Sequence, residues 1–265
     1  NGIPPPMMKA VMGPILAQIG RRVRGIDLFA GGRLAEIGLR KLVNFVAAIE
    51  SDPKIAAHAR TVGNHVVEQD VRTVDWSQFK GIEYIHASPV CKSYTPTNRE
   101  AGEKELDIET ARAVAKAITQ LRPRVVSVEN VARYRGSEAM GLIEKALVKG
   151  GYRYDAEVYD AADHGVPQHR NRLILRAVRG DLALVKPKAA QPHRGWYDSV
   201  KDLDLPEDPA GLAPWQKERL GWAGITPSIG TSAYDQQQDE IRGRLEIQFR
   251  RLRGALRHTN SIGVN

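Results

Sequence analysis

The chain has 265 residues and a mass of 29.3 kDa, and its 42% hydrophobic and 26% charged residues exclude an extended disordered chain or a collagen-like repeat. It carries 39 Lys and Arg against 31 Asp and Glu, which gives a formal net charge of +8. This charge favours a polyanionic partner such as nucleic acid, but by itself it indicates only non-specific attraction. Its one cysteine, Cys91, excludes an internal disulfide and a multi-cysteine zinc site, so we expect a cytoplasmic protein without a metal.

Residues 23–176 alternate short β-branched runs with amphipathic helical stretches, which is typical of a parallel sheet covered by helices. Asp52 and Pro53 predict the N-cap and first residue of one helix, and Pro123 ends another that is predicted at 107–121. No apolar run approaches the roughly 18 to 20 residues that cross a bilayer, so we expect no membrane partner. The expected fold is a doubly wound, mostly parallel α/β sheet with strands at 23–29, 44–50, 65–69, 82–87, 124–129, 154–158 and 172–176.

After residue 177 the sequence becomes irregular and rich in Pro, Gly, Trp and polar residues. Residues 181–240 are therefore predicted to form a small second region, and 241–265 a basic helix with an apolar stripe. The arginines of that helix, including Arg250 and Arg253, have two interpretations, contact with phosphates or a solvated face over an apolar contact.

A glycine turn follows the first predicted strand, and an acid ends the next strand. Gly31 and Gly32 would let the backbone approach a nucleotide-like ligand, and Glu50, 23 residues after Asp27, could accept both ribose hydroxyls of an adenosine. Asp70 stands at a similar position after the third strand and could accept from an adenine amino group. The alternative interpretation of this turn is simple packing of a strand against a helix.

The lone thiol lies in a loop after the fourth strand, within residues 85–93, at the edge where open α/β sheets bind ligands. Beside Lys92, Cys91 is well placed to become a nucleophilic thiolate, although a single buried cysteine is more often a small hydrophobic residue. Glu129 ends the fifth strand and should face the same crevice. Arg170 and Arg172, two residues apart, lie on one face of the last strand.

Ser-Pro-Val-Cys at 88–91, Glu-Asn-Val at 129–131 and Gln-His-Arg-Asn-Arg at 168–172 together resemble signatures of the DNA cytosine-5 methyltransferase family, over residues 23–176. The resemblance implies a seven-stranded, Rossmann-like class I fold that uses S-adenosylmethionine on a cytosine flipped out of double-stranded DNA. It also implies the catalytic roles. Cys91 would add to cytosine C6, Glu129 would bind and protonate N3, and Arg172, helped by Arg170, would hold the base carbonyl and the thiolate loop. We therefore predict surroundings that raise the pKa of Glu129.

The resemblance assigns further positions and a domain plan. The domains would be a catalytic unit at 1–180, target recognition at 181–240, and a basic helix at 241–265 that packs back on the catalytic unit. A monomer is expected, with a partner subunit left open. S-adenosylmethionine would contact Asp27, Phe29, Ala30, Gly31, Gly32, Glu50, Ser51, Asp70, Val71, Pro89, Leu106 and Asn1. DNA would contact Ser88, Lys92, Ser93, Asn130, Gln168, Arg250 and Arg253.

Residues 1–20, which begin Asn-Gly-Ile-Pro-Pro, resemble the last motif of that family, a turn leading into a helix beside the cofactor. Here the turn precedes the first motif, and 261–265 resemble the approach to it, so we hypothesise a circularly permuted member. The alternative is a proline-capped helix whose similarity is due to chance.

Departures from the family pattern in two places leave the function open among alternatives. Arg33 and Leu34 stand where glycines usually continue the first turn, and in the thiol loop Val90 replaces the proline before the cysteine and Lys92 the glutamine after it. Arg33 and Leu34 would crowd the methionine moiety of the cofactor, or Arg33 would bind its carboxylate or favour an altered donor. The function expected first is an active DNA methyltransferase of bacterial restriction-modification or phage type. The alternatives are a catalytically weak DNA-binding or regulatory homologue and a tRNA cytosine-5 methyltransferase.

Overall fold

The structure, a computed structural model, describes residues 2–63, 65–90, 103–187 and 190–193. All of them lie in the first of two compact units of the chain, Asn1–Trp196. The predicted boundaries of the recognition region and of the basic helix fall largely outside the described residues and stay predictions.

A seven-stranded sheet forms the centre of this unit, in the order β3-β2-β1-β4-β5-β7-β6. Strands β1 to β5 run parallel, and β7 pairs antiparallel with both β5 and β6. The predicted doubly wound, mostly parallel sheet is therefore confirmed, with boundaries shifted by at most two residues. The strands are β1 Val23–Asp27, β2 Val43–Glu50, β3 Val66–Glu68, β4 Tyr84–Ala87, β5 Val125–Asn130, β6 Arg153–Asp160 and β7 Asn171–Val178.

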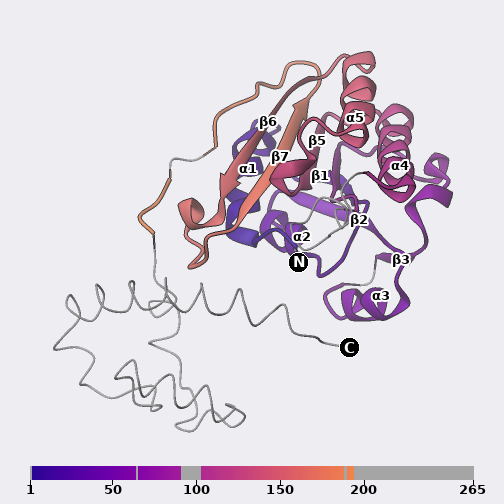
Figure 1. Cartoon of the computed structure of the whole chain (residues 1–265), viewed down its shortest axis with the longest axis horizontal. Coiled ribbons are helices and arrows are strands. Elements are labelled where there is room, and N and C mark those ends of the chain that lie inside the picture. Colours follow the sequence, from indigo (N-terminus) through magenta and orange to yellow (C-terminus); the bar gives the residue numbers. More distant parts are fainter. Residues whose placement is uncertain (1, 64, 91–102, 188–189, 194–265) are drawn as a thin grey trace, which may run out of the picture. The chain divides into compact units, whose positions relative to one another are not determined.

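Helices cover both faces of the sheet, as Figure 1 shows. α4 and α5 pack on one face through a cluster that contains Val114 and Ile143, whereas α1 packs on the other through Met8 and Val11. The helices are α1 Pro5–Ala17, α2 Leu34–Leu39, α3 Pro53–Arg60, α4 Glu105–Leu121 and α5 Glu138–Lys149. Among the described residues, no helix combines the length and the apolar character that crossing a membrane requires.

Local sequence signals explain where the helices begin. Asp52 caps α3 as predicted, because its Oδ1 accepts from the backbone N–H groups of Lys54 at 2.8 Å and Ile55 at 3.1 Å. α4 begins at Glu105, two residues before the predicted start, since Asp107 occupies the third helical position and its side chain accepts from the Lys104 backbone N–H at 2.8 Å. Both helices thus start at acids that match the positive end of the helix dipole.

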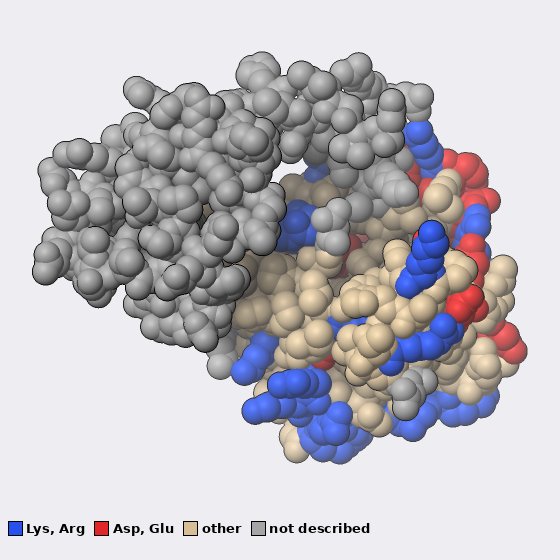
Figure 2. Space-filling view, turned by 90° about the horizontal axis from the view of Figure 1, so that it is seen from below, with Lys and Arg blue, Asp and Glu red and all other residues tan. Residues whose placement is uncertain are grey.

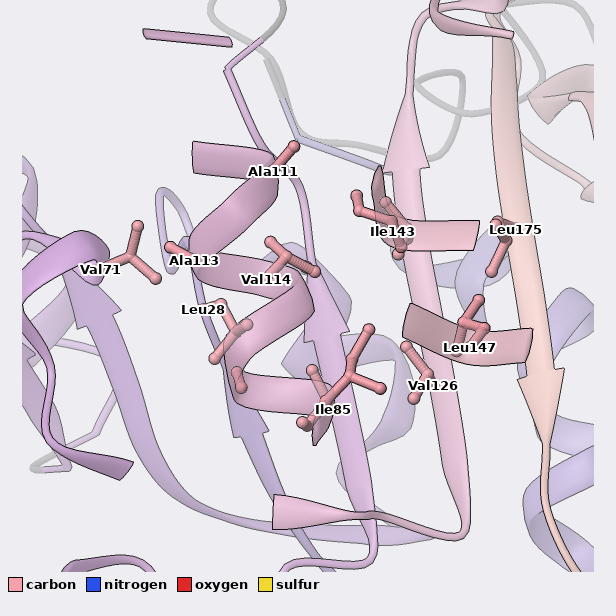
Figure 3. Close-up of a cluster of buried hydrophobic side chains, with 14 of the residues drawn as sticks. Leu28, Val71, Ile85, Ala111, Ala113, Val114, Val126, Ile143, Leu147 and Leu175 are labelled. Atoms are coloured by element: carbon pink, nitrogen blue, oxygen red, sulfur yellow. The ribbon is translucent and has the colours of Figure 1, made fainter. Parts of the chain in front are cut away.

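The larger core lies between the sheet and helices α4 and α5. Figure 3 shows side chains from β1, β4 and β5 meeting α4 and α5, with Leu28, Ile85 and Val126 pointing toward Val114 and Leu147. The strand residues are apolar on both faces because helices cover both, as buried parallel strands require. This packing fixes the strand ends, and so the edge at which Asp27, Glu50 and Asn130 lie.

Residues 181–187 and 190–193 follow β7 and run back beside the sheet (Figure 1, orange). The Arg176 guanidinium donates to the Val185 carbonyl at 2.9 Å, and at the far end the Gln191 N–H donates to the Asp163 carbonyl at 2.8 Å. His193 Nε2 lies 2.7 Å from Asp163 Oδ1. We call this the return segment. It brings the chain from the end of β7 back to the turn that precedes β7.

Helix α1 packs closely on α2 at a glycine. A Cβ atom built on Gly38 would lie 2.6 Å from the Pro5 carbonyl oxygen, which is closer than real Cβ atoms approach backbone. Gly38 is therefore required by the contact between the two helices rather than by its own backbone angles.

Gly38→Ala is expected to destabilise the protein by about 1 to 3 kcal/mol, because the added methyl group pushes α1 away from α2. Gly141→Ala in α5 is the matched control, since its new Cβ meets nothing within 4 Å. That variant should gain roughly 0.5 to 1 kcal/mol from reduced backbone entropy. Thermal unfolding midpoints check both, and equal shifts in the two variants would contradict the close contact.

Candidate active site

The predicted glycine turn and the acid of the second strand meet in the structure. Gly31 has φ +47°, in the left-handed region that favours glycine, and its N–H donates to Glu50 Oε2 at 2.9 Å. The other carboxylate oxygen, Oε1, accepts from the Asp52 N–H at 2.9 Å. Glu50 is thereby fixed at the carboxyl end of β2, beside the turn that follows β1.

These residues fit the nucleoside end of S-adenosylmethionine. A Cβ atom added to Gly31 would find only the Phe29 carbonyl oxygen, at 4.0 Å, so the turn leaves room for a ligand. Each Glu50 oxygen keeps a lone pair for a ribose hydroxyl. The Asp70 carboxylate is also at this edge and is held by Arg72, whose Nη2 lies 2.6 Å from Oδ2 and lowers the pKa of that carboxyl. Val71 is buried beside it.

Other predicted cofactor residues are spread around this turn. Ala30 and Pro89 are buried, Phe29 is partly buried, and Gly32 and Ser51 are exposed. Leu106, in the first turn of α4, is 45% exposed. No group of three or more His, Cys, Asp or Glu in the described part of the chain is arranged to hold a metal ion.

Asp27 lies beneath the turn rather than facing it. Its side chain is 1% exposed, and Oδ1 accepts from the Phe29 N–H at 3.1 Å. Burial, with the Glu36 carboxylate as the next cause, raises the pKa of Asp27 to about 8. The side chain therefore holds the turn from below, and it carries a proton at neutral pH.

The structure contradicts the expectation that Arg33 offers a cation to the cofactor. Its guanidinium is buried and donates to Glu36 at 2.8 and 2.5 Å and to the carbonyls of Ala59 at 3.2 Å and Gly63 at 3.0 Å. It also contacts His65 Nε2. Arg33 adopts φ +57°, a region in which glycine is less strained, which explains why glycine suits this position. The sequence signal for the ion pair between Arg33 and Glu36 was their spacing of three residues at the start of a helix.

Replacing Arg33 with methionine is expected to destabilise the protein by about 3 to 5 kcal/mol, because it leaves the Glu36 carboxylate buried without its guanidinium partner. Arg33→Met/Glu36→Leu removes both charges and should recover most of the loss. Urea unfolding midpoints measure both. A loss for the single variant below about 1 kcal/mol would contradict a buried ion pair, since surface pairs contribute that little.

The strand before the cysteine loop is anchored to its neighbours. The Asn130 side-chain amide donates to the Pro89 carbonyl at 3.2 Å, and Ser88 Oγ donates to the Phe29 carbonyl at 3.4 Å. Asn130 thus fixes Pro89 from β5, and Ser88 is bonded to the residue that opens the glycine turn. Neither bond was predicted, because both residues were assigned to DNA contact.

Glu129 and Arg172 are brought together at the same edge of the sheet. Arg172 Nε lies 2.9 Å from Glu129 Oε1, and both side chains are largely buried. Burial raises the pKa of Glu129, as predicted, while Arg172 and then Arg170 oppose the rise. A carboxyl group with a raised pKa next to arginines is poised to hold or release a proton.

Arg170 is fixed through its backbone and its side chain. Its N–H donates to Asp160 Oδ1 at 2.8 Å, and Nη2 donates to the Gly2 carbonyl at 3.2 Å. The segment before α1 therefore reaches Arg170 of the Gln-His-Arg-Asn-Arg motif, which is compatible with a role for residues 1–20 at the site. Gln168 is exposed two residues earlier. The permutation itself stays a prediction.

A buried polar group under the site was missed by sequence reasoning. His86 Nδ1 lies 2.9 Å from Ser127 Oγ, and the Tyr84 hydroxyl lies 2.6 Å from the same oxygen. Burial lowers the pKa of His86 to about 4, so the imidazole is neutral. The signal was a histidine and a serine within apolar strands, where polar residues need partners.

Six predicted site residues lie outside the described residues. They are Asn1, Cys91, Lys92, Ser93, Arg250 and Arg253. Their assigned roles stay predictions, as does convergence of the Cys91 sulfur on the pair formed by Glu129 and Arg172.

The strand order and the position of the glycine turn after β1 define a class I, Rossmann-like methyltransferase fold. The S. pombe Dnmt2 methyltransferase structure shares this fold, with a TM-score of 0.56 at 17% identity, over 77% of this chain and 67% of that one. The profile of the C-5 cytosine-specific DNA methylases matches residues 23–236, and the chain belongs to that family.

Curated relatives match over about half of their own length. Type II methyltransferase M.PspPI from Psychrobacter sp. (strain TA137) is 29% identical over 213 residues, which cover 74% of this chain and 51% of the relative. Type II methyltransferase M.Eco47II from Escherichia coli is 29% identical over 213 residues, with the same shares of 74% and 51%. The chain thus spans about half the length of these relatives.

Proposed function

We propose that the protein transfers a methyl group from S-adenosylmethionine to C5 of a flipped cytosine in double-stranded DNA, through a covalent Cys91 adduct. The observation that carries the proposal is the buried pair of Glu129 and Arg172, 2.9 Å apart at the edge that also holds Gly31 and Glu50. Membership in the cytosine-5 family supports the same substrate. Cytoplasmic location in a bacterium, as part of restriction-modification, is proposed with it, on the strength of the type II relatives.

Glu129 would bind the flipped base through N3. The Cys91 thiolate forms a bond to cytosine C6 while N3 takes a proton, so the electron pair of the C5–C6 double bond becomes available at C5. Burial raises the pKa of Glu129 and so favours the protonated carboxyl that N3 requires, and Arg172 fixes the orientation of the carboxyl group. C5 then takes the methyl group, and loss of the C5 proton to water allows the sulfur to leave C6. The double bond and the thiolate are regenerated, and the N3 proton returns to Glu129.

Gly31, Glu50 and Asp70 would hold S-adenosylmethionine, Glu50 on the ribose and Asp70 on the adenine. When bound, this group supplies an electrophilic methyl for C5. Asn130 would keep the loop before Cys91 at the edge through its bond to the Pro89 carbonyl. The alternative of a catalytically weak homologue then depends on Leu34 and Val90, because the Arg33 guanidinium is held elsewhere. The alternative of a tRNA methyltransferase would use the same Cys, Glu and Arg.

The test uses the full chain with S-adenosylmethionine and duplex DNA that contains 5-fluorocytosine, whose fluorine blocks the final elimination. We expect an adduct that resists denaturation in the wild type and is absent in Cys91→Ser. Adduct on tRNA alone would replace the proposal with the RNA-modifying function. Absence of adduct on either nucleic acid, with DNA still bound, would favour the catalytically weak homologue.

A further inference from the structure

Cationic side chains gather at the edge of the sheet opposite the candidate active site. They flank the first residues of β1, β2, β5 and β6 and the last residue of β7, which all lie at this edge because β7 runs antiparallel. We call this the basic edge, and it consists of Arg21, Arg22, Arg24, Arg40, Lys41, Arg122, Arg124, Arg153 and Arg179.

Acidic residues balance few of these charges. Arg21 pairs with Glu83 at 2.7 Å and Arg124 with Asp181 at 2.7 Å. The other seven have no carboxylate partner in the described part of the chain. The arginines of α3 and α4 are paired instead, Arg60 with Glu68 at 2.9 Å and Arg112 with Glu105 at 3.2 Å. Figure 2 is seen from the side of the candidate active site, where Asp and Glu gather with several Lys and Arg on the right of the view and further Lys and Arg line its lower margin.

Helix dipoles account for only part of this charge. α1, α2, α4 and α5 each precede a strand that starts here, so their carboxyl ends lie at the same edge. Each end carries about half a negative charge, so four helices offset about two of the cations. Most of the positive charge therefore remains for an external anion.

Several guanidinium groups are held in place by the backbone. Arg22 Nη2 donates to the Val43 carbonyl at 3.2 Å, Arg153 Nη2 to the Gly180 carbonyl at 3.0 Å, and Arg179 Nη2 to the Arg122 carbonyl at 2.5 Å. Fixed guanidinium groups lose less conformational entropy when they bind phosphate, and their planar fork suits two phosphate oxygens.

The candidate active site is too far away to share one straight duplex with this surface. The six residues of β5 separate the two edges by about 17 to 20 Å, and the edges face opposite directions. Resting on the proposed action on DNA, we propose that the basic edge binds the phosphate backbone of a second duplex DNA segment while the first occupies the active site. Charge complementarity and regular phosphate spacing favour duplex DNA as the occupant.

The first test measures DNA binding by the full chain without catalysis. Arg24→Gln/Lys41→Gln/Arg122→Gln removes three edge cations whose side chains make no hydrogen bond within the described residues. Lys9→Gln/Lys116→Gln/Lys145→Gln removes three cations elsewhere and is the control. We expect the edge variant alone to reduce the slope of log affinity against log salt by roughly 2 to 3. Equal slopes in the two variants would overturn the proposal, whether or not methyl transfer occurs.

The second test asks for two duplexes at once. The covalent 5-fluorocytosine adduct is presented with a labelled second duplex, which the wild-type adduct should capture and the edge-variant adduct should not. Equal capture of the second duplex by both adducts overturns the assignment. It is also overturned if the edge binds vesicles of anionic lipid, or single-stranded RNA, more strongly than duplex DNA. Failure to form an adduct counts against the proposed function, whereas the salt slopes still decide the proposal for the basic edge.

Discussion

Glu129→Gln is expected to lower the rate of methyl transfer by roughly 10²- to 10⁴-fold, the usual contribution of a positioned acid or base. Glutamine keeps the shape and a hydrogen bond to the base, but it has no titratable proton to move to or from N3. Burial raises the pKa of the Glu129 carboxyl, so the wild-type side chain holds its proton to higher pH than an exposed glutamate does. Single-turnover transfer of labelled methyl groups measures the effect.

The fold and the binding of DNA should survive the Glu129 substitution. Glu157→Gln, an exposed acid on β6, is the matched control and is expected to keep the wild-type rate. Full activity in Glu129→Gln, with an unchanged pH profile, would show that another group handles the N3 proton. A slowed variant whose pH profile loses its alkaline limb supports the assignment.

The stability of the wild-type protein is expected to fall as the pH rises from about 4 to about 8, and Asp27→Asn should remove this contribution. Folding raises the pKa of Asp27 to about 8, whereas an unfolded aspartate titrates near 4. Between these values the folded state holds a proton that the unfolded chain has released. The stabilising contribution is therefore complete at the acid end and lost toward pH 8, by several kcal/mol at most.

Urea unfolding at several pH values measures this linkage as the difference between variant and wild type. The side-chain carbonyl of the Asp27→Asn variant would still accept from the Phe29 N–H, so the turn should persist. Asp75→Asn is the control, because hydrogen bonds from Ser77 lower the pKa of that exposed carboxyl and move its transition to acid pH. A wild-type curve parallel to the Asp27→Asn curve would contradict a protonated Asp27.

The strand positions were predictable because buried parallel strands appear in the sequence as short runs of β-branched residues. The cap at Asp52 was predictable because a helix cap depends only on neighbouring residues. That Glu129 and Arg172 lie at one site followed from the resemblance to a family rather than from periodicity, whereas their direct ion pair was not predicted. Arg33 shows the limit of such reasoning. Its neighbours in space, Ala59, Gly63 and His65, are 26 to 32 residues away in sequence, and nothing local indicates that the guanidinium turns toward them.

The basic edge was also out of reach of the sequence. Its nine cations come from separate segments, and each segment alone resembles an ordinary charged loop. Only the strand order brings Arg22, Arg124 and Arg179 to one side, through the pairing of Val23 with Val43 and of Val125 with Val178.

The return segment separates the hairpin that carries Arg172 from the part of the chain that follows residue 193. Its bonds from Val185 to Arg176 and from Gln191 to Asp163 tether the polypeptide at both ends of the hairpin formed by β6 and β7. Loop length between these anchors is consequently free to drift over generations without disturbing Glu129 or Arg172. A lineage of such enzymes would thus be able to exchange whatever lies downstream of residue 193 while inheriting its chemistry intact.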